Sequence, residues 1–188
     1  MNEKQIQSLI SLIKLLHQQK YPKLAIAVIV VVLLLVSYDW IRKSWFPPPP
    51  DHCEVLNIYD GDTMTLQCPG QSEKTKVRMY CIDTPEMKQK PWGTQARDHL
   101  RAIAEGKMVQ LVEVNKDRYG RVVGEVYSDD INLNIAQVKA GYAAVYKAYC
   151  KKPEYNSVEN EAKQAKLGIW SQPGIQQTPW EWRKQQRK

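Results

Sequence analysis

The stretch Glu54–Gln67 reads EVLNIYDGDTMTLQ and sets an Asp-Gly turn between two short runs of strand-forming residues. An Asp-Gly pair between such runs is a strong short-range signal for a β-hairpin. Gly61 supplies the permissive backbone that a tight turn requires. The stretch therefore predicts a first hairpin with strands at 54–58 and 63–67.

Three further strands and three helices follow the hairpin in the sequence. Val77, Met79 and Cys81 alternate with polar residues, which is the period of a half-buried strand. Each predicted helix ends at a glycine, and Thr94 stands where a side chain would cap the first one. Strands are predicted at 54–58, 63–67, 74–82, 107–115 and 121–128, and helices at 94–104, 132–139 and 158–166. This order predicts an α+β fold, a five-stranded barrel of oligonucleotide-binding (OB-fold) type with three helices.

The first fifty residues differ in composition from the rest of the chain. The run 24–37 carries no charge and is almost wholly aliphatic, and aromatic residues follow it as they do at a membrane interface. This pattern predicts an uncleaved transmembrane helix at 24–46. Because the uncharged run is shorter than the ~20 residues that usually span a bilayer, a cleaved signal peptide and a soluble buried helix stay open as alternatives.

The charges around this run predict its orientation. Four lysines precede it, against Arg42 and Lys43 after it, which favours a cytoplasmic N-terminus and a periplasmic or extracellular domain. Segment 1–23 has helical apolar spacing and is interpreted as a cytoplasmic amphipathic segment, with a frayed tail as the alternative. The predicted single-pass membrane protein continues with a proline-rich spacer at 47–52, the domain at 53–171, and a basic tryptophan-containing tail at 172–188.

The formal net charge of +7 would suggest nucleic-acid binding if the excess basic residues lay in the domain. Residues 1–50 carry six basic and two acidic side chains, and residues 181–188 carry four basic and one acidic. The segment between them is therefore neutral overall. The net charge alone therefore says more about the membrane segment and the tail than about a basic binding groove in the domain.

Four cysteines lie in the predicted domain. Counting outward from the hairpin turn places Cys53 opposite Cys68, where a disulfide can form. Cys81 and Cys150 are then the remaining pair, and four free thiols are the alternative. Zinc is not expected, because the sequence has no CxxC motif and no Cys/His cluster.

Three carboxylates and one arginine stand beside two predicted turns. Asp62 lies in the motif YDGDT, and Arg78, Asp83 and Glu86 lie in the motif VRMYCIDTPE. Hard divalent cations prefer carboxylate and carbonyl oxygens, and an arginine fork fits the nonbridging oxygens of a phosphodiester. The two motifs therefore predict a metal-assisted phosphodiester site. Asp60 is interpreted as a turn residue that accepts backbone hydrogen bonds.

With these motifs the chain from about Cys53 to Trp170 resembles the staphylococcal nuclease (thermonuclease) family. The matching stretches occur in order, as YDGDT, VRMYCIDTPE, ARDHLRAIAEGK, DRYGRVVGEVY, NLNIAQVKAGYAAVY and EAKQAKLGIWS. The resemblance implies a five-stranded OB-fold barrel with three helices. It also implies a calcium-dependent phosphodiesterase that cuts DNA and RNA, single strands preferred, with little sequence specificity and with 3′-phosphate products.

The resemblance also carries roles to individual residues. It implies catalytic roles for Arg78, Glu86 and Arg121, calcium ligation by Asp62, Asp83 and the carbonyl of Thr84, and substrate contacts by Arg118, Tyr119 and Tyr149. Glu86 is expected to act on a water molecule, and two arginines are expected to hold the scissile phosphate. Lys147 stands where the family has a second tyrosine, and Tyr146 can replace that tyrosine only with a shift of register.

Other interpretations stay open. The main rival is a nucleic-acid-binding barrel without catalysis, although such a copy is expected to lack some of these side chains, and this sequence retains them. A phosphodiesterase for another phosphate ester is a third. His52 and His99 stand in no metal-ligand spacing, so a histidine nuclease is not expected. Trp180, Trp182 and Arg183 are interpreted as docked on the barrel or as part of a mobile tail, with base stacking as the alternative. No protein partner is predicted.

Overall fold

The computed structural model describes residues 26–31, 33, 34, 37 and 52–187. The chain divides into two units, 1–48 and 49–188. In the first unit the described residues are helical, and no helix that they form combines the length and hydrophobicity of a membrane span. The predicted segment at 1–23 and most of those at 24–46 and 47–52 lie outside the described residues.

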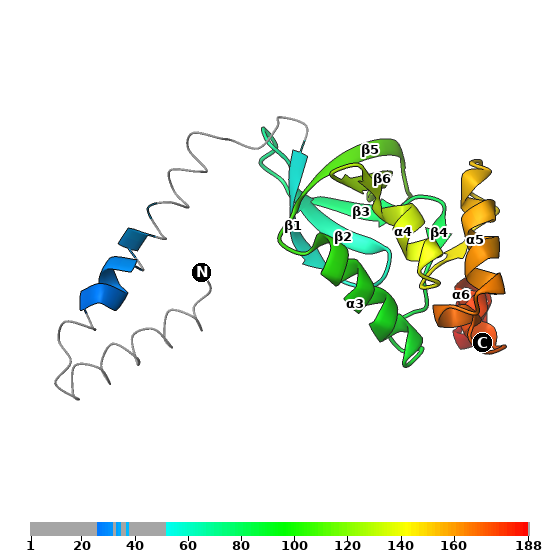
Figure 1. The fold of residues 1–188 in the computed structure, drawn as a ribbon. Coiled ribbons are helices and arrows are strands. Elements are labelled where there is room, and N and C mark those ends of the chain that lie inside the picture. The colour runs from blue at the N-terminus through cyan, green and yellow to red at the C-terminus, as the bar shows by residue number, and fades with distance from the viewer. Residues whose placement is uncertain (1–25, 32, 35–36, 38–51, 188) are drawn as a thin grey trace. The chain divides into compact units, whose positions relative to one another are not determined.

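The second unit is built on a β-barrel (Figure 1). Its long strands are β1 (His52–Ile58), β2 (Thr63–Gln67), β3 (Thr75–Met79), β5 (Met108–Lys116) and β6 (Val122–Ser128), and the short β7 (Ile131–Asn132) follows β6. They pair in the order β3-β2-β1-β5-β6, and a parallel pairing of β3 with β6 closes the sheet. The prediction of a five-stranded barrel of OB-fold type is confirmed.

The first hairpin reaches its predicted register through two irregularities that cancel. Val55 pairs with Leu66, as counting outward from the turn predicts. Nearer the turn, Ile58 pairs with Met64, because the turn is one residue longer than the prediction assumes. A β-bulge between Val55 and Asn57 absorbs the extra residue and restores the register toward the open end of the hairpin.

Both predicted cysteine pairs are bonded in the structure. Cys53 and Cys68 lie opposite each other at the open end of the hairpin, with their Cα atoms 4.1 Å apart. Cys81 and Cys150 are 69 residues apart in sequence, and none of the cysteines is free. On the chain-entropy account, closing a loop of that length stabilises the fold by ~4 kcal/mol. The second bond therefore fastens the segment that carries Asp83 to the C-terminal half of the domain.

The predicted strand at 74–82 is divided in the structure, which corrects the sequence analysis. β3 ends at Met79, and Cys81 adopts a positive φ of 67° that turns the chain. Positive φ is uncommon for residues other than glycine, so the alternating pattern gave no sign of the break. The chain continues as β4 (Ile82–Asp83), which pairs with β8 (Ala144–Val145) in a separate two-stranded sheet.

Helices cover the barrel, as Figure 1 shows, and they are α3 (Trp92–Ala104), α4 (Leu133–Lys139), α5 (Glu154–Gln164) and α6 (Pro179–Gln186). Short 3₁₀ turns, η1 (Gly168–Trp170) and η2 (Ile175–Gln177), connect α5 to α6. α3 packs against β1, and α4 packs against α3, α5 and β6. Asn132 caps α4 by accepting a hydrogen bond from the backbone N of Ile135 at 3.1 Å.

Two helices begin earlier than predicted and a third was not predicted, and a proline stands at the start of each. Thr94 caps nothing, because α3 begins at Trp92 with Pro91 as its N-cap. α5 follows Pro153 and begins earlier than the predicted residue 158. α6, which the sequence analysis did not predict, has Pro179 in its first turn. Proline is favoured at helix starts because its fixed φ suits a helix and its missing N–H has no partner to lose there.

A buried carboxylate ties α5 to the barrel. Glu125 of β6 is 2 % exposed, and its carboxylate accepts hydrogen bonds from Lys152 Nζ at 2.5 Å and from Tyr155 Oη at 2.6 Å. Burial by itself would raise the pKa of Glu125. The hydrogen bonds from Lys152 and Tyr155 outweigh burial and hold the pKa below its ordinary value of 4.5.

We expect Glu125→Gln to lower the free energy of unfolding by about 1–3 kcal/mol, because an amide cannot satisfy donors that face it from both sides. Since the pKa of Glu125 is lowered by folding, its stabilisation is present above the ordinary pKa and is lost as the pH falls through the folded value. Urea unfolding of both proteins at pH 7 and near pH 3 measures this. If the difference in free energy of unfolding between the two proteins were the same at both pH values, the lowered pKa of Glu125 would be contradicted. Glu154→Gln, a change at an exposed carboxylate, is the control.

Candidate active site

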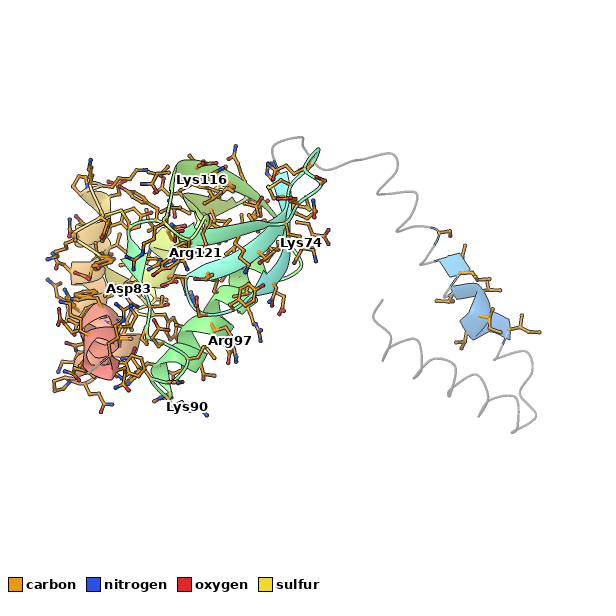
Figure 2. The ribbon with its side chains drawn as sticks, turned by 180° about the vertical axis from the view of Figure 1, so that it is seen from behind. Lys74, Asp83, Lys90, Arg97, Lys116 and Arg121 are labelled. Carbon is orange, nitrogen blue, oxygen red and sulfur yellow. A yellow bond between two sulfur atoms is a disulfide. The ribbon has the colours of Figure 1, made fainter. Side chains whose placement is uncertain are left out.

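A cavity of about 700 Å³ opens on the barrel beside the first hairpin turn and β4. The residues predicted for the site all line it: Asp62, Arg78, Asp83, Thr84, Glu86, Arg118, Tyr119, Arg121 and Tyr149. Figure 2 shows two of them, with Asp83 on the side of the barrel next to the C-terminal helix and Arg121 on the barrel itself. Segments far apart in the sequence therefore converge on one cavity.

Asp62 is held in the hairpin turn by three donors. Its Oδ2 atom accepts hydrogen bonds from the backbone N and the Oγ1 of Thr84, both at 2.9 Å, and its Oδ1 accepts one from Thr63 Oγ1 at 3.1 Å. Asp60 supports the same turn by accepting a hydrogen bond from the backbone N of Asp62 at 3.0 Å. This is the turn role that the sequence analysis assigned to Asp60, and it fixes the Asp62 carboxylate toward the cavity.

Arg78 joins the two aspartates. Its Nη2 atom lies 2.9 Å from Asp83 Oδ1 and 3.3 Å from Asp62 Oδ2, and its Nη1 donates to the carbonyl of Met79 at 2.7 Å. Asp83 is 1 % exposed. The turn at Cys81 brings Asp83 back toward β3, so the two carboxylates meet at one guanidinium nitrogen.

Glu86 contacts a residue that the sequence analysis placed in the tail. Its Oε1 lies 2.9 Å from Nη1 of Arg183, whose Nη2 lies 2.7 Å from the second oxygen of Asp83. The Glu86 side chain is 38 % exposed, so it also faces the open cavity. Arg183 belongs to α6. In the structure this segment is docked, which is one of the alternatives that the sequence analysis left open. The sequence signal for α6 was Thr178-Pro179, a helix start followed by a mixed polar and aromatic run.

Arg121 also lines the cavity and has its own acidic partner, Asp117. Asp117 accepts hydrogen bonds from the Nε and the backbone N of Arg121, at 2.8 and 3.0 Å. Tyr119 is 67 % exposed, with the guanidinium carbons of Arg118 and Arg121 at 4.8 and 5.8 Å from its ring centroid. Asp117, which the sequence analysis missed, orients Arg121 and leaves the terminal nitrogens of its guanidinium available to donate.

Aromatic side chains form the remaining wall. Tyr149 is 66 % exposed, and its ring centroid lies 4.9 Å from that of Tyr146. Tyr146 stacks on Trp180 of α6, with ring centroids 5.3 Å apart and ring planes 7° from parallel. Tyr146 and Tyr149 both line the cavity, so Tyr146 reaches the site although Lys147 takes the position of the tyrosine expected from the family resemblance.

The turn that carries Asp62 is packed closely against α3 and α4. A Cβ added at Gly61 would lie 2.7 Å from Cβ of Ala96 and 2.9 Å from Cγ2 of Thr84, and the Gly61 φ is not positive. Gln137 of α4 donates from Nε2 to the Gly61 carbonyl at 2.6 Å. Gly61 is therefore required for its small volume, and the predicted role as a source of backbone freedom is wrong.

Gly61→Ala is expected to lower the free energy of unfolding by about 1–3 kcal/mol, because the new methyl group overpacks a closed contact. It should also weaken cation binding, since the same shift moves Asp62. Chemical denaturation and calcium titration of the variant measure the two effects. Unchanged stability would contradict the close packing of this turn.

Four carboxylates, those of Asp60, Asp62, Asp83 and Glu86, line one part of the cavity, where two guanidinium groups, of Arg78 and Arg183, pair with them. Burial, with the nearby charge of Asp62, raises the pKa of Asp60 to about 7 and that of Asp83 to about 6, despite the opposing effect of Arg78. Among the described residues, no group of three or more His, Cys, Asp or Glu side chains is arranged as a metal cluster. The donor set nevertheless suits a hard divalent cation, because the atoms that would bind it are carboxylate and carbonyl oxygens.

Comparison with known proteins identifies the relatives of this domain. Residues 76–172 match the family described as staphylococcal nuclease homologue. The chain belongs to the staphylococcal nuclease family. An uncharacterized endonuclease of Escherichia coli is 37 % identical over 133 residues, which are 70 % of this chain and 84 % of that protein.

Two further relatives extend this comparison within the staphylococcal nuclease family. An uncharacterized endonuclease of Haemophilus influenzae is 35 % identical over 135 residues, covering 72 % of this chain and 74 % of that protein. The staphylococcal-like nuclease CAN1 of Arabidopsis thaliana is 39 % identical over 116 residues, 62 % of this chain and 35 % of that protein. This membership makes the chain a nuclease, as the sequence analysis predicted.

Proposed function

We propose that this staphylococcal nuclease homologue is a calcium-dependent phosphodiesterase that cuts DNA and RNA with little sequence specificity, prefers single strands, and leaves 3′-phosphate ends. One observation carries the proposal. Asp62, Asp83 and Glu86 meet Arg78 and Arg121 in a single open cavity. This combination suits the hydrolysis of a phosphodiester, because the substrate is already negative and its oxygens gain charge in the transition state.

Asp62 and Asp83 are the residues that would hold calcium, with the Thr84 carbonyl as a further ligand. Bound calcium would supply a Lewis acid that polarises the phosphate. The hydrogen bonds from Thr84 keep the Asp62 carboxylate oriented before any cation arrives. Pre-orientation of this kind lowers the cost of assembling the site.

Glu86 is the group that would take a proton from the attacking water. Its side chain is partly exposed to the cavity, so water can reach it, and its backbone N donates to Gln89 Oε1 at 2.8 Å, which fixes the loop that carries it. The new bond joins the water oxygen to phosphorus, and the bond from phosphorus to the 5′ oxygen breaks. The products are a 3′-phosphate and a 5′-hydroxyl end.

Arg78 and Arg121 would donate to the nonbridging oxygens of the phosphate. A planar guanidinium offers paired donors that match these oxygens. Arg118 and Tyr119 extend the same wall and suit a neighbouring phosphate. Exposed Tyr149 offers a ring face on which an unpaired base can stack, which favours single strands.

A test compares cleavage and binding by the full chain on single-stranded DNA, RNA and duplex DNA, with and without calcium. The proposal expects cleavage of all three, fastest for single strands, and product ends that a polymerase extends only after phosphatase treatment. Binding of single strands without any product would favour the rival, a nucleic-acid-binding barrel without catalysis. Products with 5′-phosphate ends would contradict the proposed bond cleavage.

We also propose that residues 24–46 anchor the enzyme in a membrane, with the nuclease domain on the periplasmic or extracellular side. The support is the uncharged aliphatic run and the excess of lysines before it. Flotation with liposomes tests the anchor: the full chain should float with the vesicles, and a chain that begins at residue 47 should not. Equal behaviour of the two proteins would contradict the anchor.

A further inference from the structure

Helix α6 is fixed at the rim of the active-site cavity. Pro179 in its first turn is buried, and the Trp180 ring stacks on Tyr146. The segment before it is held by Gln176, whose Nε2 donates to the carbonyl of Gln172 at 2.8 Å. Arg183 of the helix and Arg187, its C-cap residue, both line the cavity. The C-terminal segment therefore contributes side chains to the site, beyond residue 172 where the family match ends.

Arg183 occupies the two carboxylates that the proposed mechanism needs most. Its guanidinium bridges Asp83 and Glu86 through separate nitrogens, at 2.7 and 2.9 Å. The other oxygen of Asp83 already accepts a hydrogen bond from Arg78. Both oxygens of Asp83 are thus paired with guanidinium groups, and a cation that binds this carboxylate competes with them for its oxygens.

Arg183 is the easier of the two arginines to replace. Arg78 projects from β3, in the closed ladder of the barrel, and also contacts Asp62 and the Met79 carbonyl. Arg183 projects from an eight-residue helix, and its side chain is 30 % exposed. Pro179 is the buried residue of this helix, and elements with few buried contacts open at a lower free energy than core strands. A divalent cation on Asp83 also repels an adjacent guanidinium with twice the force of a single charge.

We infer that Arg183 is a displaceable counter-ion of the metal site. It pairs with Asp83 and Glu86 in the metal-free protein, and a divalent cation must displace it before the site is active. α6 thereby sets the cation concentration at which the nuclease becomes active. The inference rests on the proposed function, because it takes Asp62 and Asp83 as the calcium ligands.

The test is a calorimetric titration of calcium chloride into the full chain, Arg183→Gln and Lys184→Gln, without nucleic acid. Lys184 is the matched control, because it is adjacent on the same helix, carries the same charge and pairs with Glu181 at 2.7 Å. Arg183→Gln should bind calcium about tenfold more tightly than the wild type, since the competing ion pair is gone. Lys184→Gln should bind like the wild type.

Hydrogen exchange gives a second readout that does not depend on activity. Calcium should speed amide exchange in α6 of the wild type, and exchange in Arg183→Gln should be fast without calcium. Equal or weaker calcium binding by Arg183→Gln would overturn the inference, and so would α6 exchange that calcium leaves unchanged. If all three proteins bound calcium with the same affinity, only this inference would be overturned. If none of them bound calcium, the proposed calcium site would be overturned as well.

Discussion

Glu86→Gln is expected to lower kcat by about 10²- to 10⁴-fold, the usual contribution of a general base. Glutamine keeps the size of the side chain and can still accept a hydrogen bond from Arg183, but it cannot take a proton from water. Glu86 is partly exposed and lies at the surface of the cavity, so the fold should be unaffected. Single-turnover cleavage of a short DNA strand measures the loss directly.

The matched control for this variant is Glu73→Gln, an exposed carboxylate that does not line the cavity. Its rate should equal that of the wild type. Calcium affinity of Glu86→Gln should change far less than its turnover, because Asp62 and Asp83 remain. A variant that cleaves at a near-normal rate would remove Glu86 from the mechanism.

Arg121→Ala should lower kcat/KM by about 10²- to 10³-fold, as expected when a donor to developing charge is removed from an active site. Asp117 holds the Nε of Arg121, so the lost donors are the terminal guanidinium nitrogens. Arg121→Lys should fall between the wild type and Arg121→Ala, because an ammonium retains the charge but not the planar fork. Steady-state kinetics on single-stranded DNA rank the three proteins.

Arg97→Ala is the control for this series. Arg97 lies on α3 (Figure 2), pairs with Asp98 at 2.8 Å and does not line the cavity. The Arg97→Ala variant should cleave DNA at the same rate as the wild type. If Arg121→Lys matched the wild type, paired donation by Arg121 would be refuted, and only its charge would matter.

The barrel and most of the site could be predicted because their signals are local. The Asp-Gly turn, the alternation in β3 and the glycines that follow the helices each act within a few residues, so the sequence pattern contains them. The catalytic carboxylates and arginines stand in motifs that resemble those of the family. The cavity then brings all nine of these predicted residues together.

The missed features depend on tertiary contacts. Nothing in the alternation of residues 74–82 signals that Cys81 turns the chain with a positive φ. The need for Gly61 to be small becomes visible only when Ala96 of α3 lies against it. In the sequence Arg183 is one of several basic residues in a tail. Its contact with Asp83, a residue 100 positions earlier, forms only because α6 docks beside that residue.

The most direct test of the account is calcium-dependent hydrolysis of single-stranded DNA by the full chain, with chelator and Glu86→Gln as the comparisons. The account predicts cleavage that calcium supports, that chelator abolishes and that Glu86→Gln loses while it still binds calcium. Cleavage that persists in chelator, or that Glu86→Gln retains, would contradict the metal-assisted mechanism built on Asp62, Asp83 and Glu86.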